Sequence, residues 1–104
     1  MLAPDMDIAS FEAKAGEVAD TLKAIGNARR LMVLCKLVER CEVTVGDLAH
    51  EVGLSPSAGS QHLAKMRDEG LVAFRRDGQT LWYRIADARV EALLATLYQL
   101  YCKD

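Results

Sequence analysis

The sequence predicts a mainly helical α+β domain, in which four helices precede a β-hairpin and a fifth helix follows it. Apolar residues recur at helical spacing through most of the chain. A helix stop signal at Gly53 is followed directly by a start signal at Ser55-Pro56, and Asp77-Gly78 separates two β-prone runs. A chain of 104 residues, 51% of them hydrophobic, can bury one modest core. The expected order of elements is therefore α-α-α-α-β-β-α.

The first two helices are predicted from apolar residues that share one face. Residues 10–25 are expected to form the first helix, with Ser10 as its N-terminal cap. Gly26 and Asn27 break this helix, and Asn27 can cap the second one. The apolar face of the second helix contains Leu31, Leu34, Cys35 and Val38. On this spacing Cys35 is expected to fill space in the core.

The third and fourth helices are predicted to form a helix-turn-helix. Thr44-Val45-Gly46-Asp47 resembles a capping box and opens a short helix that runs through Val52. Gly53 can end this helix with a positive φ, and Ser55 and Pro56 can begin a helix that ends at Gly70. Gly59, inside that helix, lowers helix propensity by about 1 kcal/mol relative to Ala. Polar residues able to contact base edges or phosphates are Ser55, Ser57, Ser60, Gln61, His62 and Lys65.

Two β-prone runs, 71–76 and 79–85, follow and are expected to pair as a hairpin. A helix-turn-helix followed at once by such a hairpin is a winged helix, whose recognition helix enters the major groove of DNA. Arg75, Arg76 and Gln79 near the hairpin tip are expected to contact phosphates. The net charge is −2, but residues 55–89 contain six Lys/Arg and four Asp/Glu, so the basic excess coincides with the predicted DNA-binding part.

Asp87 can cap a last helix over about 88–102, which has a wide apolar stripe. The first and last helices have no evident role inside so small a core, which indicates a two-fold homodimer interface. The residues expected there are Phe11, Val18, Leu22, Leu93, Leu94, Leu97 and Tyr101. Residues 1–9 are expected to be a flexible N-terminus, and residues 10–104 to form one winged-helix domain for DNA binding and dimerisation.

Several classes of protein are not expected from this sequence. No apolar run is long enough to span a bilayer, and charged residues occupy the N-terminal region where a signal peptide would be apolar. A cytoplasmic protein with reduced thiols, no membrane partner and no cofactor is therefore expected. The sequence has no paired carboxylates, phosphate loop or arrangement of nucleophile and base, so an enzyme is not expected.

Three groups of segments resemble the ArsR/SmtB family of winged-helix repressors over nearly the whole chain. These segments are Leu22-Lys23-Ala24-Ile25-Gly26-Asn27-Ala28-Arg29-Arg30-Leu31, Leu54-Ser55-Pro56-Ser57 with Gln61-His62-Leu63, and Leu71-Val72 through Trp82-Tyr83. The resemblance implies a homodimer that leaves double-stranded operator DNA when an inducer alters the dimer.

The metal sites that the resemblance implies for many family members lack their ligands in this chain. A Cys-x-Cys pair at the start of the third helix is replaced by Thr44 and Gly46, and the last helix contains no His. Cys41 and Cys102 instead resemble the cysteines of the sulfide-responsive subgroup, the BigR/SqrR type. Leu34-Cys35, the segment 66–71 and the ending Tyr98-Gln99-Leu100-Tyr101-Cys102 also belong to this resemblance.

The resemblance implies that Cys41 and Cys102 react with persulfide or polysulfide to form a sulfur-bridged crosslink, and that the reduced protein binds DNA. A thiolate would attack the sulfur donor and the second thiol would resolve the product. Two alternatives remain open. One is a metal-responsive repressor of the same family with a non-standard site that includes cysteine. The other is a winged helix that binds a protein and no DNA.

Overall fold

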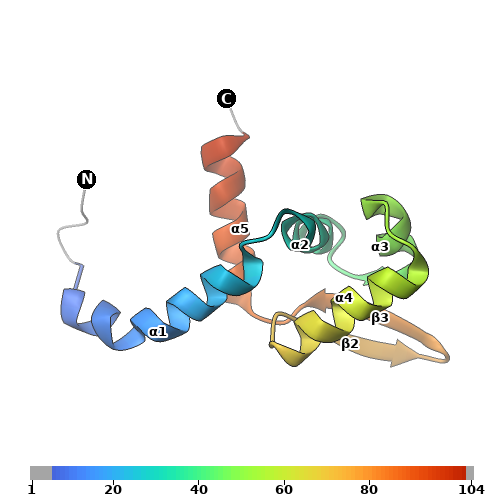
Figure 1. The fold of residues 1–104 in the computed structure, drawn as a ribbon, viewed down its shortest axis with the longest axis horizontal. Coiled ribbons are helices and arrows are strands. Elements are labelled where there is room, and N and C mark those ends of the chain that lie inside the picture. Colours follow the sequence, from blue (N-terminus) through green and yellow to red (C-terminus); the bar gives the residue numbers. More distant parts are fainter. Residues whose placement is uncertain (1–5, 103–104) are drawn as a thin grey trace.

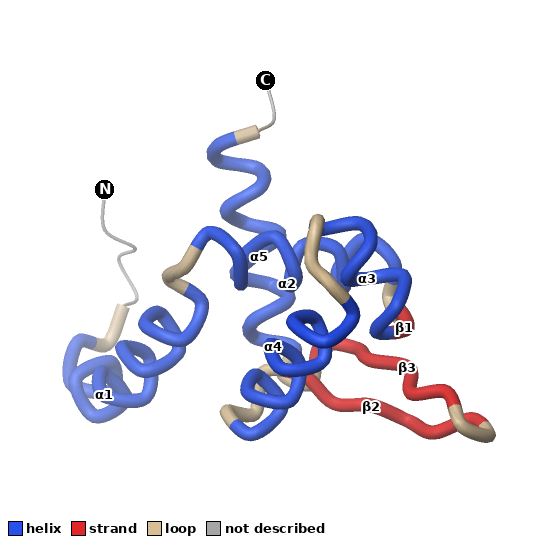
Figure 2. The backbone as a smooth tube through the Cα atoms, turned by 45° about the vertical axis from the view of Figure 1, so that its right-hand side comes forward, coloured by secondary structure: helices blue, strands red, loops and turns tan. Residues whose placement is uncertain are grey.

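The computed structural model describes residues 6–102, and Figure 1 shows how the elements are arranged. Its elements are α1 (Ile8–Ile25), α2 (Ala28–Arg40), β1 (Val43–Thr44), α3 (Val45–Val52), α4 (Pro56–Asp68), β2 (Val72–Asp77), β3 (Thr80–Ile85) and α5 (Ala88–Tyr101). The predicted winged helix-turn-helix is confirmed. Helices α2 to α4 and the hairpin pack together, whereas much of α1 and of α5 extends away from them (Figures 1 and 2).

Helix α1 begins earlier than predicted, at Ile8, because its N-terminal cap is Asp7 and not Ser10. The Asp7 carboxylate accepts hydrogen bonds from the backbone N–H of Ala9 at 3.1 Å and of Ser10 at 3.3 Å. The Ser10 hydroxyl donates to the same carboxylate at 2.8 Å, and this bond holds the pKa of Asp7 below its usual value. A carboxylate suits the positive end of a helix. Of the expected flexible segment, residues 1–5 lie outside the described residues.

The sheet contains a strand that the sequence did not predict. The two residues of β1 pair with the middle strand β3, giving the antiparallel order β1-β3-β2. A strand of this length is too short to show an alternating apolar pattern. The hairpin turn is also shifted by one residue: Gly78 and Gln79 form it, and Gly78 has a φ of +64°. A glycine with positive φ at the first turn position is what a type II′ hairpin requires.

The core lies where α2, α3, α4 and the sheet meet. Helix α2 buries Val33, Leu34 and Leu37, and α4 buries Leu63 and Met66. The prediction that Cys35 fills space in this core is wrong, because its side chain is exposed. Leu34 is buried as expected, whereas Leu31 and Val38 are only partly buried against the core.

Leu94 also departs from its prediction as a dimer-interface residue. Its side chain is only 4% exposed and belongs to the core of the single chain. Helix α5 therefore uses one part of its apolar stripe to attach itself to the domain, so that only the remainder can meet a partner. No helix within residues 6–102 is long and apolar enough to cross a membrane.

Candidate DNA-binding surface and thiol groove

The joint between α3 and α4 has the geometry that the sequence predicts for a helix-turn-helix. Gly53 has a φ of +75° and ends α3 in the left-handed conformation. The next backbone N–H, that of Leu54, donates to the Ala49 carbonyl at 2.8 Å. The Ser55 Oγ then accepts from the Ala58 N–H at 3.1 Å, which caps α4. These bonds satisfy groups that a helix end leaves unpaired, so they fix the direction in which α4 leaves the turn.

Gly59 allows the backbone of α4 to lie directly against α3. The residue is buried, and a Cβ built on it would lie 2.9 Å from the Cβ of Ala49. Real Cβ atoms do not approach so closely, because the contact is far inside the van der Waals distance. The low helix propensity of Gly59 is thus offset by close packing between the two helices of the motif.

Helix α4 presents most of the predicted DNA contacts on its free face. Ser57, Ser60, Gln61 and Lys65 are exposed, and His62 is half-buried. The opposite face buries Leu63 and Met66 in the core, which holds the helix in place. Ser55 is exposed as well, but its side-chain oxygen already accepts the capping bond. The exposed groups are short hydrogen-bonding side chains and one cation, which suit base edges and phosphates.

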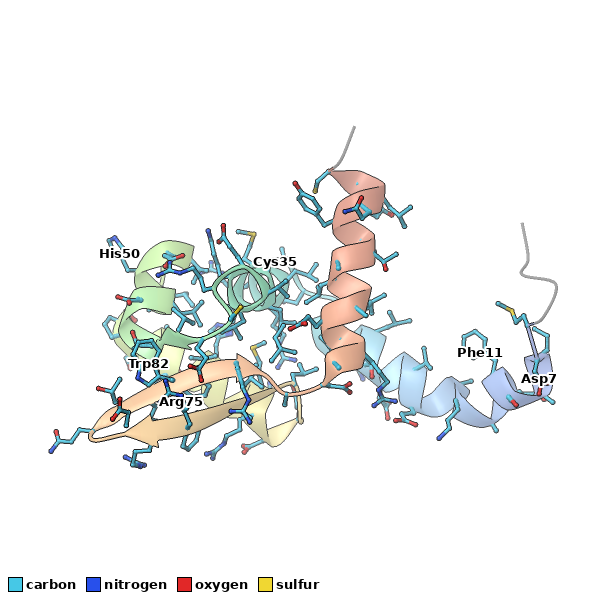
Figure 3. The ribbon with its side chains drawn as sticks, turned by 180° about the vertical axis from the view of Figure 1, so that it is seen from behind. Asp7, Phe11, Cys35, His50, Arg75 and Trp82 are labelled. Atoms are coloured by element: carbon cyan, nitrogen blue, oxygen red, sulfur yellow. The ribbon has the colours of Figure 1, made fainter. Side chains whose placement is uncertain are left out.

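Arg75 differs from the other predicted wing contacts because its guanidinium already has a partner. Its Nε and Nη2 donate to the two carboxylate oxygens of Glu42, at 2.8 and 3.0 Å. The same guanidinium lies 5.6 Å from the ring centre of Trp82, and Figure 3 shows these two side chains together on the sheet. The pair lowers the pKa of Glu42 and raises the pKa of Arg75. Arg76 and Gln79 stay exposed on the hairpin.

A groove between α2 and α5 brings Cys35 and Cys102 to one site. Its volume is about 330 Å³, and it is lined by Leu31, Cys35, Leu94, Leu97, Tyr98, Tyr101 and Cys102. All three cysteines of the chain are free thiols. Partial burial raises the pKa of the Cys35 thiol, and the nearby Cys102 raises it further. The groove therefore places two thiols against an apolar wall, and Cys35 is labelled on α2 in Figure 3.

Cys41 lies elsewhere on α2. It forms the C-terminal cap of the helix with a φ of +68°, and it is not among the residues that line the groove. Sequence reasoning placed Cys35 in the core and so missed its position beside Cys102. The signal that could have identified it is the Leu34-Cys35 pair, which belongs to the resemblance described above.

The predicted dimer residues divide into two groups. Phe11, Val18, Leu22 and Tyr101 are exposed, while Leu93 and Leu97 are half-buried and Leu94 is core. Val18, Leu22 and Leu93 line a second groove, of about 500 Å³, between α1 and α5. Arg89 bridges the same two helices, since it contacts the Glu17 carboxylate at 3.0 Å and that of Asp87 at 2.9 Å. This groove thus joins one part of the apolar face of α1 to one part of that of α5.

Metal-ligating side chains do not gather in residues 6–102. No cluster of three or more His, Cys, Asp or Glu residues is placed there to hold a metal ion. His50 is exposed on α3 and His62 is half-buried on α4.

Comparisons with known proteins agree with this geometry. Residues 27–73 match the family model of bacterial regulatory proteins of the arsR family. Over 96 residues the chain is 44% identical to the HTH-type transcriptional regulator YgaV of Escherichia coli (strain K12). That match covers 92% of this chain and 97% of the relative.

Two solved structures have the same fold along nearly their whole length. The transcriptional repressor BigR from Xylella fastidiosa is similar at a TM-score of 0.85 and 35% identity, covering 95% of this chain and 100% of that one. A homodimeric winged helix-turn-helix domain from Mycobacterium bovis is similar at a TM-score of 0.74 and 32% identity. That match covers 95% of this chain and 89% of the other. Because sequence and fold agree over this length, the chain belongs to the arsR family of bacterial regulatory proteins.

Proposed function

We propose that this protein is a homodimeric transcriptional repressor that binds operator DNA when its thiols are reduced and releases it when they react with persulfide or polysulfide. The observation that supports the sensing step best is the groove shared by Cys35 and Cys102. The geometry favours Cys35 over Cys41 as the partner of Cys102, because Cys41 caps the far end of α2. Cys41 with Cys102, the pair expected from the sequence, is the alternative that the experiment below tests.

DNA binding rests on α4 and the wing. The free face of α4 would enter the major groove with Ser57, Ser60, Gln61 and Lys65, and Arg76 and Gln79 would contact phosphates beside it. The exposed apolar faces of α1 and α5 would form the two-fold interface. A homodimer sets two copies of α4 at a fixed spacing and doubles the modest basic excess of residues 55–89. Because the net charge of one chain is −2, strong binding to DNA needs this doubling.

The thiol chemistry can be written with an organic trisulfide, R–S–S–S–R, as the donor. One cysteine thiolate attacks the central sulfur, so that a protein–sulfur bond forms, a donor S–S bond breaks and R–S⁻ leaves. The second thiolate attacks the same transferred sulfur and releases the second R–S⁻. Two protein thiols are thereby oxidised to a bridge with one added sulfur, and the trisulfide is reduced to two thiols. The added sulfur relaxes the Cα separation limit of about 7 Å that a direct disulfide imposes.

The bridge would act on DNA binding through the helices that it joins. It would tie α5, part of the proposed dimer interface, to the middle of α2, which packs on α3. A constraint between these elements favours one arrangement of the two DNA-binding motifs over another. Allosteric couplings of this kind amount to about 1–3 kcal/mol.

The test treats reduced protein with dimethyl trisulfide and compares wild type with Cys35→Ser, Cys41→Ser and Cys102→Ser. Peptide mapping should find a sulfur-inserted Cys35–Cys102 bridge in wild type and in Cys41→Ser, and fluorescence anisotropy should show that both release a bound duplex. Cys35→Ser and Cys102→Ser should stay bound. A bridge that persists in Cys35→Ser would identify Cys41 as the partner. Release of DNA by a variant without any bridge would refute the two-thiol mechanism.

A further inference from the structure

The Arg30 side chain joins three helices at one guanidinium. Its Nη1 donates to the Ala24 carbonyl at 2.7 Å and to Glu69 Oε1 at 2.7 Å, and its Nη2 reaches Glu69 Oε2 at 3.4 Å. Ala24 lies in the last turn of α1, Arg30 in the first turns of α2, and Glu69 is the C-terminal cap of α4. The Arg30 side chain is only 14% exposed and that of Glu69 is 36% exposed, so the guanidinium is the better shielded of the two charges.

The two charges occupy positions that their own helices disfavour. A cation near the start of α2 faces the positive end of that helix dipole, and a carboxylate at the end of α4 faces a negative end. Each charge therefore opposes its own helix and is offset by groups from other helices, which are Glu69 and the Ala24 carbonyl for Arg30 and Arg30 for Glu69. The Ala24 carbonyl is one of the acceptors that the end of α1 leaves without a helical donor. The arrangement therefore fixes the orientation of α1, α2 and α4 relative to one another and does not stabilise any one of these helices by itself.

The pair lies between the two parts of the molecule that must be aligned for DNA recognition. Helix α1 presents a free apolar face, and α4 presents the polar groups that would contact bases. We propose that Arg30 is a positioning residue that fixes the orientation of the recognition helix α4 relative to α1 and α2, and thereby sets sequence specificity without touching DNA. The proposal rests on the DNA-binding part of the proposed function and is independent of its thiol chemistry.

The test compares Arg30→Gln, Glu69→Gln and the double variant with wild type, in reduced protein. The matched control is Arg29→Gln, which removes a neighbouring exposed arginine. The probes are a duplex that wild type selects from a random-sequence library and an unselected duplex of equal length, each titrated at several salt concentrations. Affinity for the selected duplex should fall about tenfold in Arg30→Gln and in Glu69→Gln, and no further in the double variant. The control Arg29→Gln should keep the wild-type preference for the selected duplex. Affinity for the unselected duplex and the slope against salt should not change, because no phosphate contact is lost.

Other outcomes overturn the proposal. If Arg30 contacts a phosphate, Arg30→Gln will lower both affinities and reduce the salt slope by about one for each protomer. If the pair only stabilises the fold, the unfolding temperature will fall while binding of both duplexes at low temperature stays at the wild-type level. A wild-type protein that prefers no duplex would contradict this proposal and the proposed DNA binding together, whereas unchanged preference in the variants contradicts this proposal alone.

Discussion

At the scale of single residues, Arg75 has a different role in the structure from the one that the sequence predicts. The sequence places it beside Arg76 on a hairpin, where both would be read as phosphate contacts. In the folded chain Arg75 of β2 binds both oxygens of Glu42, the residue before β1, and its guanidinium lies over the Trp82 ring on β3. Arg76 has no such arrangement and remains the better candidate for DNA.

Asp87 gives a prediction at the same scale. Its carboxylate caps α5 and pairs with Arg89, and the hydrogen bond from the Arg89 side chain, with help from the Arg89 N–H, lowers the pKa of Asp87. A lowered pKa contributes stability above the unfolded value of about 4, and that stability is lost as the pH falls through the folded value. We expect Asp87→Asn, which can still cap the helix, to lose less stability than wild type between about pH 5 and pH 2.

The measurement is urea unfolding at a series of pH values. Both proteins will lose stability on acidification, because Asp7, Glu17 and Glu42 also have lowered pKa values. Since Arg89 also contacts Glu17, the difference between the two curves reports mainly, but not solely, the charge of Asp87. Parallel curves would mean that its ion pair contributes nothing in solution.

At the scale of elements, the contact between α3 and α4 defines the helix-turn-helix. The two helices approach at Ala49 and Gly59, where one methyl group occupies the space that a second would need. Gly53 and Ser55 supply the local bonds that turn the chain, but the distance between the helices is set by this contact. Gly59 therefore has a low helix propensity within α4 but is required for the close packing of α4 against α3.

Gly59→Ala should destabilise the protein by about 1 kcal/mol, because overpacking costs about 1–3 kcal/mol and helix propensity returns about 1 kcal/mol. Ala49→Gly combined with Gly59→Ala moves the methyl group from α3 to α4. A double-mutant cycle by urea denaturation should thus give a favourable coupling of about 1–2 kcal/mol. Additive effects, or a Gly59→Ala variant more stable than wild type, would mean that the two helices can separate freely.

At the scale of the whole molecule, the free faces of α1 and α5 set the expected assembly. Leu22 is 51% exposed and Tyr101 82% exposed, although both are large and apolar. Leu94, on the same helix as Tyr101, is buried within the chain. Substitution of the exposed residues should weaken association between chains, whereas substitution of the buried Leu94 should destabilise the fold of the single chain.

Leu22→Glu should weaken dimerisation by about 2 kcal/mol or more and leave the monomer folded, because a charge at an apolar interface loses its hydration. Leu94→Ala should instead lower the free energy of unfolding by about 2–5 kcal/mol. Analytical ultracentrifugation and urea denaturation, each at several protein concentrations, separate these effects. A Leu22→Glu dimer as tight as wild type would exclude this part of α1 from the interface.

The sequence by itself determined the helices, the hairpin and their order, but not β1, because the signals for the former are local and β1 is too short to show one. Asn27, Thr44, Ser55 and Asp87 cap the helices predicted for them, and each accepts a bond from a backbone N–H two or three residues ahead. Apolar periodicity is likewise a local signal, since it shows within a window of about 11–18 residues. The winged-helix fold and the position of the exposed recognition face follow from such signals.

Only the tertiary structure decided which distant residues meet. Cys35 lines a groove with Cys102, Arg75 is bound by Glu42, Arg30 joins α1 to the end of α4, and Leu94 is used by the core. Each of these outcomes depends on the rotation of one helix or strand against another. That rotation is set by the packing of many side chains at once, such as the approach that Gly59 allows, and no local pattern in the chain records it.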